Sequence, residues 1–371
     1  MIIGVLKERL PEKRVSLVPD IVKQLGKQGV TVWVEPGAGA AAFYADDTYI
    51  QAGAAVRSRA DILQLSDLVC SIQIPEDWQL LRAGTTLAGV YQPLYHHELM
   101  QQWAAHPLTT YSLDNIPRTT RAQSMDILSS QANIAGYKAV LVAAVSYGRY
   151  FPMFMTAAGS IAPAKVLILG AGVAGLQAIA TARRLGGVVE VFDTRPAVRE
   201  EVMSLGAKFI AVAGAADASQ AGGYAVEQSP EYKQQQELLI AASIAKADIV
   251  ITTAQIPGKR APLLVTETMI NSMRPGSVIV DLAAATGGNT AFTRDQATIL
   301  HNGITIIGDS NLAASMPADA SKLYAKNVFN FLQLLIKEGQ LINNLQDDIV
   351  KGTCITHEGA VISERLQAVL K

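Results

Sequence analysis

Three glycines near the middle of the chain have the spacing of a turn that binds phosphate. Gly170, Gly172 and Gly175 form a G-x-G-x-x-G pattern directly after the apolar run KVLIL and directly before a helical pattern. In such a turn the first glycine permits a tight bend, the second lets the backbone approach a pyrophosphate, and the third allows close packing of helix on strand. The phosphates would lie at the start of the helix, where exposed N–H groups and the helix dipole favour negative charge. For the pattern alone, an ordinary glycine turn is the alternative.

A second strand pattern, VVEVFD, follows the helical pattern and ends at Asp193. An acidic residue about 20 residues after the glycines accepts hydrogen bonds from ribose hydroxyls and repels a 2′-phosphate, so it favours NAD(H) over NADP(H). Arg195 could instead attract a 2′-phosphate, but with Asp193 in place we expect it to act in capping or surface pairing. Strand, turn, helix, strand and terminal aspartate together predict a dinucleotide site.

Other residue types that could do chemistry lack suitable partners. His96 and His97 are adjacent, so their side chains diverge on a helix or strand, and no third ligand lies at a useful spacing; we predict no metal site. Cys70 and Cys354 are the two cysteines, and their separation fits a reducing compartment rather than a disulfide framework. The methionines that we expect to fill the core are Met100, Met125 and Met155.

Alternating strand and helix patterns predict the elements that would position these residues. In the first third, apolar runs such as IIGVL and DLVCSIQ alternate with helical patterns such as VPDIVKQLGKQG. From Lys165 onward the strand patterns are KVLILG, VVEVFD, AKFIAV, ADIVITT, GSVIVDLA and GITIIG, with helices or loops between them. The predicted fold class is therefore α/β, with two doubly wound Rossmann-like domains and a cleft between them.

The length of the chain and two helical patterns predict the domain boundaries. At 371 residues the chain exceeds what one hydrophobic core usually organises. An Ala-rich helical pattern from Gln131 to Tyr147 connects the two α/β patterns, and a later one after Ser321 would return the chain to the first domain. We expect a discontinuous N-terminal domain of residues 1–130 plus 318–371, and an NAD(H)-binding domain of residues 131–317.

Charge and hydropathy exclude several classes of partner. With 31 Lys+Arg against 32 Asp+Glu and no basic stripe, the chain is not expected to bind nucleic acid. Lys7, Glu8 and Arg9 interrupt the start, so no signal peptide is predicted. The uncharged stretch 166–182 approaches the length of a membrane span but contains the glycine pattern, so we interpret it as strand, turn and helix. We expect a cytoplasmic protein without direct membrane insertion.

Three further segments carry a more specific resemblance. RTTRAQSMDILSSQANIAGYKAV, GGYAVEQSPEYKQQQ and ITTAQIPGKRAPLLVTETMINSMRPGSVIVDLAAATGGN resemble, in order, the nicotinamide-binding loop, the mobile loop and the region closing the nicotinamide pocket in proton-translocating transhydrogenases. The chain thereby resembles the NAD(H)-binding component in the alanine dehydrogenase/transhydrogenase family.

The resemblance implies which residues meet NAD(H). It places Arg118, Gln123 and Asp126 nearest the chemistry, and Tyr224 on a lid over the pocket. The other implied contacts are Ser129, Val173, Thr194, Arg195, Gly223, Gln236 and Gln255, in addition to Asp193 and the three glycines. Without the resemblance, RTTRAQSMD is better interpreted as a solvated loop that caps the next helix.

The alternative within the family is alanine dehydrogenase, whose N-terminal pattern IGVLKE and KRVSLVP also fits. Arg14 is present, but the lysine, histidine and aspartate expected for amino-acid chemistry are replaced by Gln73, Gln92 and Ala285. Without them the chain lacks a carboxylate anchor and an acid/base pair. Arg14 is then expected to be a structural residue between strand and helix.

The resemblance implies a subunit that presents NADH for direct hydride transfer to NADP⁺ on a partner. The implied partners are an NADP(H)-binding transhydrogenase component and a membrane proton-translocating subunit, with a homodimer of this chain. Hydride transfer between two nicotinamides needs alignment and exclusion of water rather than a nucleophile or metal. A non-enzymatic NAD(H)-binding relative remains a further alternative.

Overall fold

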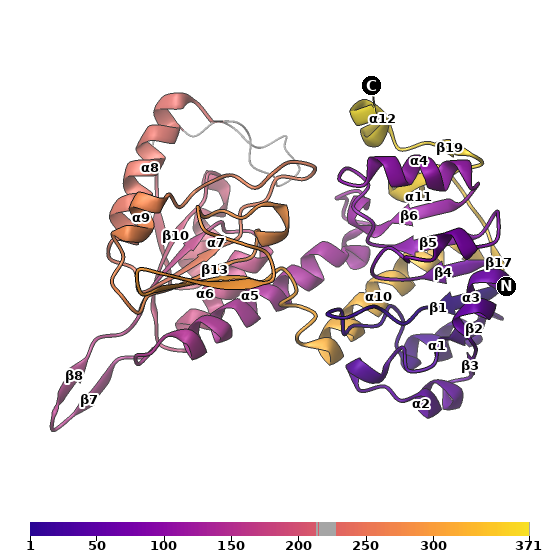
Figure 1. Cartoon of the computed structure of the whole chain (residues 1–371), viewed down its shortest axis with the longest axis horizontal. Coiled ribbons are helices and arrows are strands. Elements are labelled where there is room, and N and C mark those ends of the chain that lie inside the picture. The colour runs from indigo at the N-terminus through magenta and orange to yellow at the C-terminus, as the bar shows by residue number, and fades with distance from the viewer. Residues whose placement is uncertain (213, 215–227, 371) are drawn as a thin grey trace. The chain divides into compact units, whose positions relative to one another are not determined.

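The computed structural model describes residues 1–212, 214 and 228–370, which divide into two compact units (Figure 1). The first unit comprises residues 1–131 and 313–371, and the second comprises residues 132–312. Each unit is built on one large, mainly parallel sheet, so the predicted α/β class with two Rossmann-like domains is confirmed.

In the first unit the described residues form an eight-stranded sheet in the order β19-β18-β6-β5-β4-β1-β2-β3. Strands β1 to β6 are parallel and have the order 3-2-1-4-5-6 of dinucleotide-binding folds, while β18 and β19 add an antiparallel edge. The strands are β1 (Ile2–Val5), β2 (Thr31–Val34), β3 (Ala55–Val56), β4 (Leu68–Cys70), β5 (Thr86–Gly89), β6 (Thr109–Ser112), β18 (Cys354–His357) and β19 (Ala360–Val361).

Helices cover both faces of this sheet, which explains why its central strands β1, β4 and β5 are almost entirely buried. On β4, Leu68 and Cys70 face the core formed with α1, α10 and α11, whereas Val69 faces the core formed with α3, α4 and α12. The helices are α1 (Pro19–Gly26), α2 (Asp46–Gln51), α3 (Arg59–Leu65), α4 (His97–Ala105), α10 (Pro317–Leu335), α11 (Asp348–Thr353) and α12 (Glu364–Leu370). A small antiparallel pair, β16 (Ile336–Lys337) and β17 (Gln340–Leu341), follows α10.

In the second unit the described residues form a seven-stranded sheet in the order β11-β10-β9-β12-β13-β15-β14. All the strand patterns predicted from Lys165 onward are present and parallel, again in the order 3-2-1-4-5-6. The strands are β9 (Lys165–Leu169), β10 (Val188–Phe192), β11 (Lys208–Ile210), β12 (Ile249–Thr252), β13 (Val278–Asp281), β14 (Ala297–His301) and β15 (Ile304–Gly308). The antiparallel edge strand β14 was not predicted from the sequence.

Two sets of helices sandwich the second sheet. Val166 and Ile168 of β9 pack in the core with α5, α6 and α7, whereas Leu167 and Leu169 pack in the core with α8 and α9. The helices are α5 (Ile127–Ser146), α6 (Val173–Arg184), α7 (Arg199–Ser204), α8 (Pro230–Ile244) and α9 (Glu267–Asn271). The predicted connecting helix is thus α5, although it begins four residues before Gln131.

A hairpin of β7 (Phe154–Thr156) and β8 (Gly159–Ile161) projects from the second unit (Figure 1). Its residues are exposed, and Met155 is 73% exposed. The prediction that Met155 fills the core is therefore wrong, because the hairpin leaves the sheet, whereas Met100 and Met125 are buried as expected. The apolar stretch 166–182 forms β9, the turn and most of α6, and no helix in the described part of the chain is both long and apolar enough to span a membrane.

Candidate functional site

The glycine turn joins β9 to α6 at the carboxyl edge of the second sheet. Gly170 has a φ of +108°, and its N–H donates to the carbonyl of Phe192 (2.8 Å). A Cβ on Gly175 would lie 1.9 Å from the carbonyl oxygen of Gly170, so only glycine allows this approach of helix to turn. A Cβ on Gly172 would meet no described heavy atom within 4 Å, and no side chain caps α6 there. The first N–H groups of α6 are therefore available to an anion.

Asp193 lies just after β10 and is buried beside this turn. Its Oδ2 accepts the N–H of Ala171 (2.7 Å) and Nη2 of Arg195 (2.7 Å), while its Oδ1 accepts the N–H (2.8 Å) and Nε (2.9 Å) of Arg195. The hydrogen bonds from the guanidinium to this carboxylate raise the pKa of Arg195. Arg195 thus has the pairing role that we expected, and a ribose hydroxyl would reach Asp193 only by displacing one of these N–H groups.

The segment after β12 lies against the same turn. The hydroxyl of Thr253 donates to the carbonyl of Gly170 (3.2 Å), and Nε2 of Gln255 donates to the carbonyl of Leu282 (3.0 Å). Gln255 and Val173 are exposed, while Thr194 and Gln236 are half-buried. Gly223 and Tyr224, the implied lid residues, lie outside the described residues.

The nicotinamide-loop candidates lie in the first unit. Arg118 and Gln123 are exposed, and Gln123 begins a short 3₁₀ turn. Asp126 accepts hydrogen bonds from the N–H (2.9 Å) and the hydroxyl (2.6 Å) of Ser129, so it caps the start of α5. The capping role proposed as the alternative for this segment is therefore present.

Residues that sequence reasoning missed hold this loop in place. Asn327 and Asn330 of α10 donate to the carbonyl of Ser124 at 2.8 and 2.9 Å. Arg121 forms an ion pair with Asp347 (2.7 Å) at the start of α11. A polar Asn327 among the apolar positions of NVFNFLQLL was the available signal, because a buried amide requires hydrogen-bond partners.

Three of the positions compared with alanine dehydrogenase lie in the first unit. Arg14 is half-buried and pairs with Glu12 (2.6 Å), and its Nη1 donates to the side chain of Gln131 (2.7 Å). These contacts give Arg14 the structural role that we expected. Gln73 is half-buried, and Gln92 is exposed with a φ of +46°. Among the described residues there is no group of His, Cys, Asp and Glu that could hold a metal ion.

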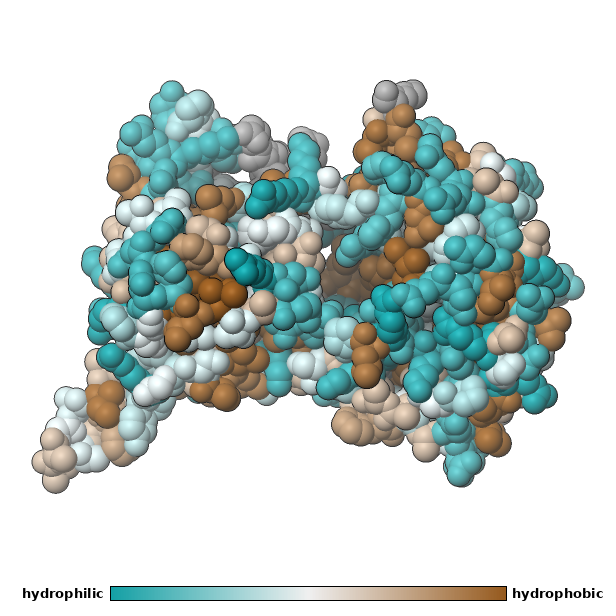
Figure 2. Space-filling view, in the orientation of Figure 1, coloured by the Kyte–Doolittle hydropathy of each residue, from teal (hydrophilic) through white to brown (hydrophobic). Residues whose placement is uncertain are grey.

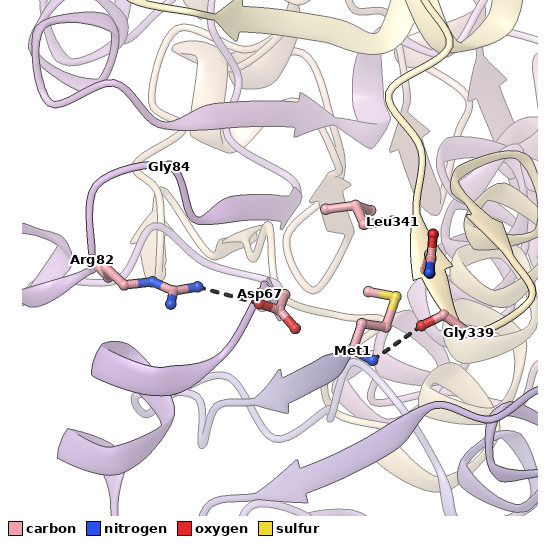
Figure 3. A pocket seen from close by; sticks show the side chains of 7 residues that line it. Met1, Asp67, Arg82, Gly84, Gly339 and Leu341 are labelled. Carbon is pink, nitrogen blue, oxygen red and sulfur yellow. Dashed lines mark hydrogen bonds and ion pairs between the residues drawn. The ribbon is translucent and has the colours of Figure 1, made fainter.

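Two cavities of the first unit lie at opposite edges of its sheet. One of about 310 Å³ lies before β1, β4 and β5, where Arg82 pairs with Asp67 (3.2 Å) and the amino group of Met1 donates to Gly339 (3.0 Å) (Figure 3). Ligands of open α/β sheets bind at the carboxyl ends of the strands, so this cavity is at the wrong edge. The other, of about 330 Å³, follows β1 and β4 and contains Glu8, whose carboxylate accepts the N–H groups of Ile72 (2.6 Å) and Gln73 (3.0 Å).

Comparisons with known proteins cover nearly the whole chain. Residues 4–135 match the family model "Alanine dehydrogenase/PNT, N-terminal domain", and residues 139–364 match "Alanine dehydrogenase/PNT, C-terminal domain". The chain is 44% identical to an NAD(P) transhydrogenase alpha-subunit protein of Rhodospirillum rubrum over 379 residues, 99% of each chain. It is similar to a crystal structure of transhydrogenase from Sinorhizobium meliloti (TM-score 0.89, 45% identity), covering 98% of this chain and 100% of that one. The similarity to a structure of L-alanine dehydrogenase is weaker, with a TM-score of 0.81 and 27% identity over 100% and 99% of the two chains.

Proposed function

The chain belongs to the alanine dehydrogenase/transhydrogenase (PNT) family, and we propose that it is the NAD(H)-binding subunit of a proton-translocating transhydrogenase. The observation that carries this choice is the replacement of the expected lysine, histidine and aspartate by Gln73, Gln92 and Ala285. Without these groups the chain cannot anchor an amino acid or move its protons. The higher identity to transhydrogenase than to alanine dehydrogenase supports the same choice.

In this proposal the second unit binds the dinucleotide by its phosphates and adenosine ribose. The uncapped start of α6 faces the pyrophosphate, with Gly172 allowing close approach and Val173 beside it. Asp193, Thr194 and Arg195 meet the adenosine ribose, which selects NAD(H). Gly223, Tyr224, Gln236 and Gln255 complete the proposed binding residues of the domain that we assign to residues 131–317.

The nicotinamide-loop residues complete the proposed site. Arg118, Gln123 and Asp126, with Ser129, position the dihydronicotinamide and exclude water. The hydride passes from C4 of NADH to C4 of NADP⁺ on the partner, leaving NAD⁺ and NADPH. Because the reaction needs aligned C4 atoms, these residues act through placement rather than proton transfer.

The proposed assembly contains an NADP(H)-binding component, a membrane proton-translocating subunit and a second copy of this chain. Its location is cytoplasmic, held peripherally at the inner membrane by the partner subunits. The exposed β7–β8 hairpin supports the homodimer, because a lone two-stranded hairpin is marginally stable in water. The hairpin carries both pale and brown side chains in Figure 2, and Met153 and Met155 are 61% and 73% exposed.

The test is hydride transfer from NADH to thio-NADP⁺, followed by absorbance after the purified chain is mixed with the NADP(H)-binding component of a transhydrogenase. We expect transfer that requires both proteins, and essentially no reduction of NAD⁺ by L-alanine when the chain is assayed alone. Alanine turnover near about 10 per second, a usual enzyme rate, would favour the amino-acid dehydrogenase instead. NADH binding without any transfer would support the non-enzymatic alternative.

A further inference from the structure

A fully buried asparagine in the second unit is bonded to the loop that follows β12. This loop, residues 253–262, carries Gln255. The side-chain oxygen of Asn289 accepts the N–H of Ala254 (3.1 Å), and its Nδ2 donates to the carbonyls of Ala254 (2.9 Å) and Pro262 (2.8 Å). The amide thus joins the two ends of the loop, using both of its donors and its acceptor.

Asn289 is itself held from the end of β13. Its N–H donates to Oδ2 of Asp281 (2.6 Å), which also accepts the hydroxyl of Thr293 (2.6 Å). The preceding Gly288 has a φ of +77°, and a Cβ there would lie 2.9 Å from Asp281, so glycine allows this close turn. Asp281 and Asn289 are both 0% exposed, and each has its hydrogen-bond partners inside the unit. Such a satisfied buried network fixes one arrangement of the backbone.

The other end of this network reaches the glycine turn. Thr253 donates its N–H to the carbonyl of Leu169 (2.9 Å) and its hydroxyl to the carbonyl of Gly170 (3.2 Å). In the sheet, β9 lies between β10 and β12. A dinucleotide whose pyrophosphate meets the turn after β9 and whose adenosine meets Asp193 after β10 extends its other half over β12. The loop that Asn289 holds is therefore on the nicotinamide side.

We propose that Asn289 is a positioning residue for the nicotinamide half of the bound nucleotide, an inference that rests on the proposed function. It acts through the backbone of residues 254–262 and so through Gln255, without touching the nucleotide. Asp281 and Thr293 orient Asn289, and the Thr253 contact keeps the loop in register with the phosphate turn. The adenosine half, bound on the other side of β9, does not depend on this network.

The test compares binding of NADH and of 5′-AMP to Asn289→Asp by calorimetry. Aspartate has nearly the same shape but cannot donate to the carbonyls of Ala254 and Pro262. We expect the dissociation constant for NADH to rise ten-fold or more, while that for AMP changes less than about three-fold, because one buried hydrogen bond is worth roughly ten-fold in an equilibrium constant. Thr293→Val is a milder change in the same network and should also raise the ratio of the NADH dissociation constant to that for AMP. It replaces Asn289→Asp in the test if that variant does not fold.

The matched control is Asp248→Asn at the amino edge of the same sheet. Asp248 is buried, accepts the N–H of Lys165 (2.9 Å) and pairs with Arg274. Replacing this carboxylate by an amide should lower the melting temperature without changing the ratio of NADH affinity to AMP affinity. If Asn289→Asp leaves the ratio of the NADH and AMP dissociation constants unchanged, including the case in which both rise equally, the positioning role is overturned. Failure of the unaltered chain to bind NADH would instead overturn the proposed function and the inference with it.

Discussion

At the scale of residues, Asp193 pairs with Arg195, and we propose that this one carboxylate sets the selectivity between NADH and NADPH. While Asp193 is present, it holds the guanidinium of Arg195 with hydrogen bonds of 2.7 and 2.9 Å, so this guanidinium does not pair with a 2′-phosphate. We predict that the unaltered chain binds NADH more tightly than NADPH. In Asp193→Ser the released Arg195 can pair with a 2′-phosphate. The ratio of the dissociation constants for NADPH and NADH should therefore fall by about ten-fold or more.

The measurement for Asp193→Ser is titration of each reduced nucleotide by its own fluorescence. The double variant Asp193→Ser with Arg195→Ala is the control, and it should lose the gained NADPH affinity. Equal or tighter NADPH binding by the unaltered chain would contradict the selectivity assigned to Asp193.

The buried carboxyl group of Glu8 should make the free energy of unfolding depend on pH. Burial raises the pKa of Glu8 to about 7, even though Ile72 and Gln73 donate N–H groups to it. As pH rises from about 4.5 to 7, the unfolded chain releases a proton that the folded chain keeps. The free energy of unfolding should therefore fall across this window, by up to about 3 kcal/mol at 1.36 kcal/mol per pKa unit. Glu8→Gln should flatten the decline, as measured by urea unfolding at a series of pH values.

Glu12, four residues after Glu8, has a lowered rather than a raised pKa and should give the opposite dependence of stability on pH. Arg14 lowers the pKa of Glu12, so the stabilisation from this pair is present above the ordinary carboxyl pKa and is lost as pH falls through the lowered value. Glu12→Gln should lower stability at neutral pH and leave the decline between about pH 5 and 7 intact. The same decline in Glu8→Gln as in the unaltered chain would exclude Glu8 as its source.

At the scale of elements, two glycines of the turn allow binding and folding to be separated. An alanine Cβ at Gly172 meets no described atom, so stability should change by less than about 0.5 kcal/mol. It would project toward the proposed pyrophosphate, and NADH affinity should fall ten-fold or more. At Gly175 the added Cβ lies 1.9 Å from the carbonyl oxygen of Gly170, so alanine should cost at least about 1–3 kcal/mol.

Urea unfolding and NADH titration of both glycine variants would test this separation. Loss of stability in Gly172→Ala, or normal stability in Gly175→Ala, would contradict the roles inferred from the glycine spacing.

Elements with strong local patterns were predictable from the sequence, and those defined by distant partners were not. Continuous apolar runs such as KVLIL identify strands buried on both faces. In contrast, β5 is the short run TLAG, and β14 is an edge strand whose residues alternate between half-buried and exposed. Strand β18 is defined by pairing with β6, more than 200 residues earlier in the chain.

The same distinction applies to the site. Gly170, Gly175 and Asp193 follow a local pattern, and the structure gives them the turn and the packing that the pattern predicts. Asn289 and Asn327 act by bonding to backbone that is distant in sequence, and an isolated asparagine carries no local signal for such contacts. Gln123 was identified only by resemblance, because an exposed glutamine in a turn has no distinctive pattern.

For the whole molecule, the proposed homodimer can be tested at the β7–β8 hairpin. If Met155 is covered by a second copy, a charge in its place should disfavour association, because burying an unpaired carboxylate is costly. Met155→Asp should sediment as a monomer while the unaltered chain sediments as a dimer. Leu300 on β14 is also 73% exposed, and Leu300→Asp is the matched control that should leave the mass unchanged. A monomeric unaltered chain, or dissociation by the Leu300 variant alone, would rule out this interface.

The last prediction concerns Gln123, whose proposed role appears only in the assembled transhydrogenase. Its exposed amide is neutral, so it can position two nicotinamides without favouring either redox state by charge. Gln123→Asn shortens its reach by one methylene and should leave NADH affinity nearly unchanged. Single-turnover hydride transfer to an NADP⁺ analogue on the partner should nevertheless slow ten-fold or more, since small misplacements of reacting atoms cost about 100-fold. Weakened NADH binding with an unchanged transfer rate would make Gln123 an ordinary binding contact and would move the assignment to Arg118 or Asp126.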